Sequence, residues 1–171
     1  MGDNYFYLIS YFDANTDANT ANNSVQLNGT PIVKLEFNGV YANIETYKTP
    51  STPNGDSYLY LYDNTFNELT RNDDSGDNLF SKIIYPLDSG RTYYIAVKGF
   101  DANDTLGYAL CVYDNADTRP AAPAADGNGA APDSMEDYND VHTGSEVLSV
   151  GTPTCRNIEA GDTDWFKIII P

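Results

Sequence analysis

Four short apolar runs between Asp56 and Tyr113 constrain the fold most strongly. Polar connections rich in glycine and aspartate separate them, an arrangement typical of antiparallel strands. The runs are Tyr58–Tyr62, Ile83–Tyr85, Tyr93–Val97 and Tyr108–Tyr113. In the last two, apolar residues share one parity, so each strand has one apolar face. β-Branched and aromatic residues dominate, and no helical period competes. This region therefore predicts half of a β-sandwich.

Five motifs follow one another in the same region: LYLYD, DDSGD, SKIIYPLDSG, RTYYIAV and GYALCVY. Their order and gaps resemble the bacterial pre-peptidase C-terminal domain. That family is a jelly-roll-like β-sandwich attached to secreted peptidases and related to clostridial collagen-binding modules. The resemblance implies an all-β, antiparallel sandwich and an exported accessory module without catalytic activity. It does not identify a ligand, because function depends on particular sites and not on the fold.

The charge balance restricts the partners. Nine Lys and Arg residues against 25 Asp and Glu residues give a net charge of −16. Such a surface repels nucleic acid and anionic membranes, so we expect neither as a partner. It suits calcium binding, although it is equally compatible with simple solvation. No segment approaches the length of a membrane-spanning helix. No GxSxG, HExxH or phosphate-loop motif is present, so we predict that the protein is not an enzyme.

Composition divides the chain into three parts. Residues 1–115 read as a β-sandwich that lacks its first strands, with further strands predicted at Tyr5–Phe12, Val25–Leu27, Ile32–Phe37 and Val40–Tyr47. Residues 116–133 are rich in Pro and Ala and contain no large apolar residue, which predicts a linker. The opening residues, MGDNYFYLISYF, have no basic region and no small-residue cleavage site, so they do not form a convincing signal peptide.

Residues 134–171 carry the motifs with which the pre-peptidase domain begins. These are SMEDYND at 134–140 and GDTDWFK at 161–167. Here they follow the end of the domain, so the sequence is circularly out of phase with the fold that it resembles. Joining the C-terminus to the N-terminus would restore the family order. We therefore interpret residues 134–171 as a donor segment.

The strand predicted at Trp165–Ile170 needs a sheet to join, because both of its faces are largely apolar. Its assembly residues are Trp165, Phe166, Ile168, Ile169 and Ile170. Left at a free end, it would expose an aggregation-prone edge. Three arrangements satisfy it: closure of its own sandwich, insertion into the next copy, or a place within a longer tandem-repeat protein. The linker reaches at most roughly 60 Å when extended and allows all three. We favour insertion or tandem repeats, which give the same filament.

Two acidic groups are candidate calcium sites, because calcium prefers six to eight oxygen ligands. The first matches the acidic opening that contributes calcium ligands in the collagen-binding relatives: Glu136, Asp137, Asn139 and Asp140, with Asp162 and Asp164 expected to converge on them. The second is a loop that carries Asp73, Asp74 and Asp77. The alternatives are an acidic cap at a strand start for the first and a tight turn for the second.

The chain contains two cysteines, Cys111 and Cys155, and one histidine, His142. This nearly excludes a zinc site. Parity places Cys111 on the outward face of its strand, and the family pattern places Cys155 outward too. Two exposed thiols in an oxidising compartment would form a disulfide, between subunits if the donor segment docks on a neighbour. The alternative is two unrelated thiols. We expect His142 to be a solvent-facing strand residue.

Three Asn-x-Ser/Thr triplets, at Asn22, Asn28 and Asn103, fall in predicted loops and are candidate glycosylation sites. Together, these features lead us to expect an extracellular or cell-surface structural subunit. It would polymerise with copies of itself, head to tail, by strand donation. The alternative is a calcium-dependent accessory module of a secreted hydrolase that binds collagen or polysaccharide.

Overall fold

The computed structural model describes residues 25–27, 30–32, 39–50, 54–123 and 142–171. The chain divides into two units, residues 1–37 and 38–171. In the first, β1 (Val25–Leu27) and β2 (Thr30–Ile32) form an antiparallel hairpin in which Val25 pairs with Ile32. The strand expected at Tyr5–Phe12, and most of the one expected at Ile32–Phe37, lie outside the described residues.

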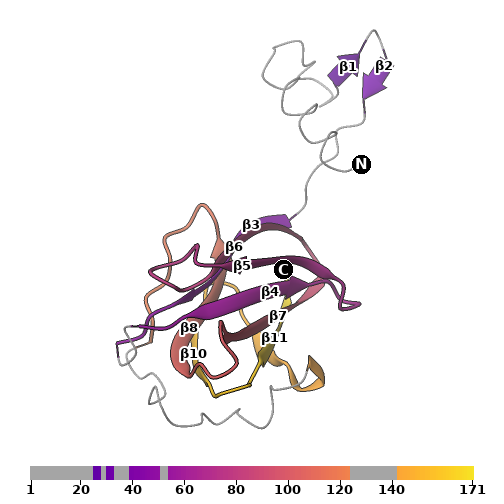
Figure 1. Ribbon diagram of the computed structural model, residues 1–171. Helices are drawn as coiled ribbons and strands as arrows, with labels where there is room; N and C mark the ends of the chain where they lie inside the picture. Colours follow the sequence, from indigo (N-terminus) through magenta and orange to yellow (C-terminus); the bar gives the residue numbers. More distant parts are fainter. Residues whose placement is uncertain (1–24, 28–29, 33–38, 51–53, 124–141) are drawn as a thin grey trace. The chain divides into compact units, whose positions relative to one another are not determined.

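The second unit is a β-sandwich of two sheets (Figure 1). One sheet has the order β10 (Thr154–Ile158), β8 (Leu106–Asp114), β3 (Gly39–Tyr47) and β6 (Lys82–Asp88). The other has the order β5 (Glu68–Asp73), β4 (Ser57–Tyr62), β7 (Thr92–Gly99), β11 (Asp164–Ile169) and β9 (Glu146–Leu148). All pairs are antiparallel except β9 with β11. The predicted all-β sandwich is confirmed.

The four apolar runs form strands as predicted, but they do not form one half of the sandwich. β4 and β7 lie in the five-stranded sheet, whereas β6 and β8 lie in the four-stranded one. Each strand has one apolar face, which is buried when another sheet covers it, and this pattern does not determine the sheet to which a strand belongs. The strand β5 was not anticipated, since Glu68–Asp73 is polar and has no alternation.

Strand alternation accounts for the core between the sheets. Tyr93, Ile95 and Val97 of β7 point inward, as do Tyr108, Leu110 and Val112 of β8. All six are at most 6% exposed. The parity predicted for both strands is therefore correct.

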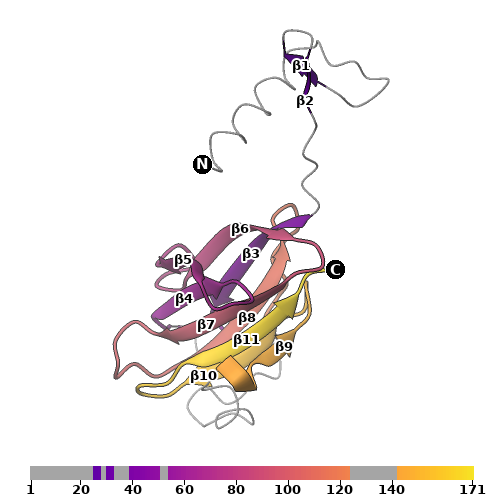
Figure 2. The ribbon, with the colours of Figure 1, turned by 90° about the vertical axis from the view of Figure 1, so that its right-hand side faces the viewer.

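Residues 142–171, here called the C-terminal segment, complete one side of this sandwich in both sheets (Figure 2). β10 pairs with β8, and β11 pairs with β7, with Phe166 opposite Ile95. Phe166, Ile168 and Ile170 are at most 1% exposed. Burial of each such side chain contributes roughly 1.5–3 kcal/mol. Within one chain, the segment thus closes its own sandwich.

The end of the chain is fastened by the turn between β6 and β7. Gly90 N donates to Ile170 O at 2.8 Å, and Ile170 N donates to Arg91 O at 3.0 Å. The Ser89 hydroxyl also donates to Pro171 O. At its other end the segment begins with a 3-10 turn, His142–Gly144, so the prediction of a strand at His142 is wrong.

Candidate functional site

The outer face of the five-stranded sheet carries a row of aromatic side chains, here called the aromatic face. It consists of Tyr58, Tyr60, Tyr62, Phe66, Tyr94, Phe100 and Trp165. Strand register explains the row: Tyr60 pairs with Ala96, which pairs with Trp165. The central alanine is 2% exposed although it faces outward. Large rings on both sides therefore meet over Ala96, and the ring centroids of Tyr62 and Trp165 lie 5.3 Å apart.

The two ends of the aromatic face differ. At one end, the Lys98 ammonium lies 5.5 Å from the Tyr58 ring and 5.3 Å from the Tyr60 ring. These two rings also stack on each other at 4.9 Å. At the other end, Phe66 lies 4.4 Å from Tyr94 and remains 38% exposed. Phe100, which stacks on Tyr58, is 50% exposed, so the row is accessible at both of its ends.

The turn between β4 and β5 fixes the position of Phe66. Phe66 has a φ of 61°, which is unfavourable for a bulky residue. One oxygen of Asp63 accepts hydrogen bonds from Thr65 N, Thr65 Oγ1 and Asn67 N, and the other accepts one from Asn67 Nδ2, all within 2.9 Å. The bonds from Asn67, followed by those from Thr65, lower the pKa of Asp63 to about 2. The ionised carboxylate therefore holds the turn.

Three carboxylates meet where β4 begins and β5 ends: Asp56, Asp73 and Asp74, with oxygens within 4.8 Å of one another. The pairing of Tyr58 with Asp73 brings Asp56, which directly precedes β4, beside this end of β5. Asp77 was predicted to join the group. Its carboxylate instead accepts a hydrogen bond from Arg119 Nη2 at 2.8 Å, which lowers its pKa. The sequence did not indicate Asp56 as a member of this group, because only the pairing of β4 with β5 brings it close to Asp73.

The three carboxylates could supply part of the oxygen ligands of a cation such as calcium. Asp56 Oδ1 and Asp73 Oδ1 are buried and accept no hydrogen bond within the described residues. Burial, followed by the negative charges of Asp74 and Asp73, raises the pKa of Asp56. Burial and the charge of Asp74 likewise raise the pKa of Asp73. Asp56, Asp73 and Asp74 would hold the ion, which would supply the missing positive charge.

The first predicted calcium group is not assembled within the described residues. Glu136, Asp137, Asn139 and Asp140 lie outside them. Asp164 is 1% exposed in the core and accepts a hydrogen bond from the Tyr108 hydroxyl at 2.5 Å. This gives Asp164 a structural role. Asp162 lies apart, in the turn between β10 and β11.

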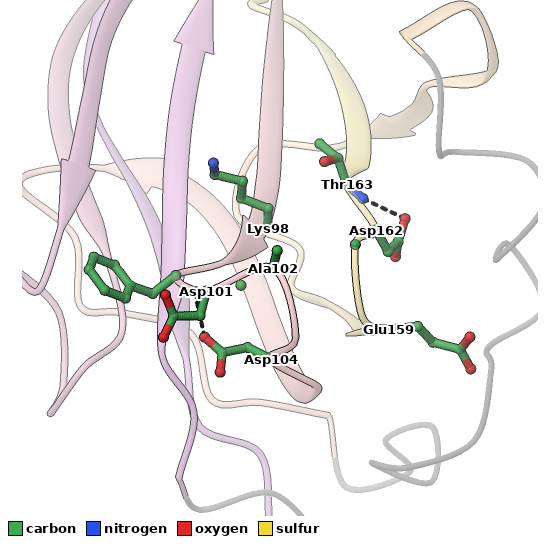
Figure 3. Close-up of a pocket in the computed structure, with 10 residues that line it drawn as sticks. Lys98, Asp101, Ala102, Asp104, Glu159, Asp162 and Thr163 are labelled. Carbon is green, nitrogen blue, oxygen red and sulfur yellow. Dashed lines mark hydrogen bonds between the residues drawn. The ribbon is translucent and has the colours of Figure 1, made fainter.

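Asp162 lines a cavity of about 380 Å³ between that turn and the turn between β7 and β8. Figure 3 shows Asp101 and Asp104 on one side of the cavity and Asp162 and Glu159 on the other. Asp101 N donates to Asp104 Oδ2 at 2.7 Å, and Thr163 N donates to Asp162 Oδ1. The carboxylates of Asp104 and Asp162 thus each accept a backbone hydrogen bond within their own turn. The candidate glycosylation site Asn103 is exposed in the turn between β7 and β8, while Asn22 and Asn28 lie outside the described residues.

The two cysteines lie on the outer face of the four-stranded sheet, as parity predicts. Cys155 pairs with Ala109, so Cys111 is its diagonal neighbour. Cys111 is nevertheless 0% exposed, which corrects the expectation of an exposed thiol. Tyr47 and Ala122 share its apolar cluster, and burial raises its pKa to about 11.

No disulfide joins the two cysteines in the structure. Cα atoms of diagonal neighbours lie about 7–8 Å apart, beyond the roughly 7 Å that a disulfide bridges without backbone movement. The disulfide, within one chain or between two, stays a prediction.

Residues 116–123, the described part of the linker predicted at 116–133, form a strap over this sheet. Arg119 Nη1 donates to Glu45 Oε1 at 2.6 Å, and its guanidinium lies 4.7 Å from the Tyr47 ring. Glu45 is 3% exposed and also accepts from the Tyr113 hydroxyl at 2.5 Å. The strap thus neutralises a buried carboxylate.

The chain matches no family model, no curated protein and no solved structure. Within the described residues, no helix is long and apolar enough to cross a membrane.

Proposed function

We propose that this protein is a non-enzymatic, extracellular structural subunit that assembles head to tail. In the assembly, the C-terminal segment of one copy completes the sandwich of the next. One observation carries the proposal: β11 lies inside the five-stranded sheet, yet the chain enters the segment only after β8 and residues 115–141. A late, separately tethered segment thus supplies an interior strand.

The same contacts serve within one chain or between two. Without the segment, β7 and β8 would become sheet edges with unpaired backbone groups, ready for strand addition. The donated side chains would be Leu148, Ile158, Phe166, Ile168 and Ile170, all of which belong to the core. A head-to-tail contact does not close on itself, so it extends into a filament.

Exchange of the C-terminal segment between copies competes with its closure within one chain. A tethered segment has an effective concentration in the millimolar range, so dilute copies close on themselves. High local concentration, or covalent continuity of copies in a tandem-repeat protein, favours exchange. A cation at Asp56, Asp73 and Asp74 would stabilise the accepting sandwich, because this group does not involve the donated strands.

A complementation experiment tests the exchange. One variant, Phe166→Asp/Ile168→Asp, has a defective donor segment. The other, Ile95→Asp, has a defective acceptor, since Ile95 is fully buried in β7. We expect each variant alone to be unfolded and a refolded mixture to give a 1:1 dimer with one sound sandwich. Light scattering and circular dichroism measure both properties, and a mixture that stays unfolded would contradict the proposal.

The aromatic face supports a second candidate function, an accessory module of a secreted hydrolase that binds collagen or polysaccharide with calcium. Exposed aromatic patches commonly mark interaction surfaces. Retention on immobilised collagen and on insoluble polysaccharides, with and without a chelator, tests this function. If neither matrix retains the protein in calcium, the second candidate is wrong.

A further inference from the structure

A small cavity lies where the aromatic face meets the beginning of the C-terminal segment. Its volume is about 260 Å³, and its lining consists of Phe66, Tyr94, Thr143, Ser145 and Lys167. Two aromatic rings therefore border a space that also receives two hydroxyl-bearing side chains and an ammonium group. Ligand sites combine apolar walls with a few polar groups in this way. The cavity is smaller than the usual drug-sized site and suits one sugar ring.

The cavity is shaped by a rigid and strained turn. The four hydrogen bonds to Asp63 hold Phe66 at its φ of 61° and keep its ring 4.4 Å from that of Tyr94. Backbone strain of this kind concentrates at binding sites, where it fixes a side chain in advance. Tyr94 is positioned independently by β7, where it pairs with Lys167 of β11. The rings and the ammonium group thus stand on separate, fixed elements.

The chemistry of the cavity matches a carbohydrate. A pyranose ring has an apolar C–H face that stacks on an aromatic ring, and its hydroxyl groups bond to polar side chains at the rim. The net charge of −16 disfavours polyanionic chains. The Lys98 ammonium already lies over the Tyr58 and Tyr60 rings, whereas the Phe66 and Tyr94 rings border the cavity.

We propose that this cavity, the Phe66 pocket, binds one sugar residue of an uncharged polysaccharide. The sugar ring stacks on Phe66 and Tyr94, while Thr143, Ser145 and Lys167 bond to its hydroxyl groups. This inference rests on the second candidate function and assigns it a ligand class and a site. It does not depend on the exchange of the C-terminal segment.

Trp165, the one tryptophan of the chain, is a built-in reporter because its ring lies 6.3 Å from Phe66. The experiment titrates the full chain with cellohexaose, maltohexaose and mannohexaose, and with an oligogalacturonate as the anionic comparison. We expect a saturable change in Trp165 emission with at least one uncharged probe and a much weaker response to the anionic one.

The variants Tyr94→Ala and Lys167→Met should each weaken binding, the first by roughly tenfold because it removes a stacking ring. The control Tyr41→Ala removes an exposed tyrosine from the four-stranded sheet and should bind as the wild type does. Circular dichroism verifies that each variant is folded.

Three outcomes would overturn the proposal: no saturable response to any uncharged probe, equal binding of the anionic probe, or unchanged binding in both pocket variants. Calcium-dependent retention on collagen without any response to sugars would overturn the Phe66 pocket alone and leave the binding-module function standing.

Discussion

Replacement of Phe166 by alanine tests directly whether the C-terminal strand belongs to the core. Phe166 is 0% exposed in β11 and lies opposite Ile95 of β7. Truncation of a buried phenylalanine costs about 3–5 kcal/mol, through lost burial and the cavity left behind. Because a small domain has only about 5–15 kcal/mol of stability, this loss is a large fraction of the total.

The matched control is Ile169→Ala, in the same strand but 54% exposed on the outer face. It should change the free energy of unfolding by less than about 0.5 kcal/mol. Urea unfolding followed by circular dichroism measures both variants, and Phe166→Ala should lower the midpoint by roughly 2 M. Equal effects of the two substitutions would refute the assignment of inward and outward faces. No effect of either would show that the strand lies outside the sandwich.

Three further predictions concern polar groups. At pH 7, calcium should raise the Tm by a few degrees. The raised pKa of Asp56 means that its ionised form destabilises the fold once the pH exceeds that pKa, so Asp56→Asn should raise the Tm without calcium. The same substitution should cancel the calcium effect. Because the pKa of Asp63 is lowered to about 2, its turn should be intact above about pH 4 and lost as the pH falls through 2. Trp165 emission should change when the turn is lost. Asp63→Ala should show the same change in emission at pH 7. Arg119→Met should cost roughly 1–3 kcal/mol by leaving Glu45 with fewer partners and should speed the reaction of Cys111 with a thiol reagent; an unchanged rate would contradict the strap.

Strand alternation made the core predictable. The inward parity of β7 and β8 follows from the sequence because a sandwich strand buries one face and exposes the other. The inward face of β11 does not follow, because both faces of Trp165–Ile170 are largely apolar. The placement of strands in sheets does not follow, because each apolar run is compatible with either sheet. β5 escaped prediction for a related reason: its position depends on pairing with β4, and its own residues are polar.

Strand parity tells which side chains point outward, but not which of them other parts of the chain cover. Cys111 points outward but is covered, since Ala122 and Tyr47 join its cluster. The acidic group also differs from the predicted one, because strand register brings Asp56 beside Asp73, and the Asp77 carboxylate bonds to Arg119 instead. The tyrosines of β4 were visible in the sequence, but their continuation to Trp165 across Ala96 required the register of three strands.

The most direct test of head-to-tail assembly is negative-stain electron microscopy of the native protein over a range of concentrations. We expect filaments at high concentration, with one sandwich per chain along the repeat. The donor-defective variant Phe166→Asp/Ile168→Asp should form none. Uniform particles with the mass of a single chain at every concentration would contradict the proposed assembly.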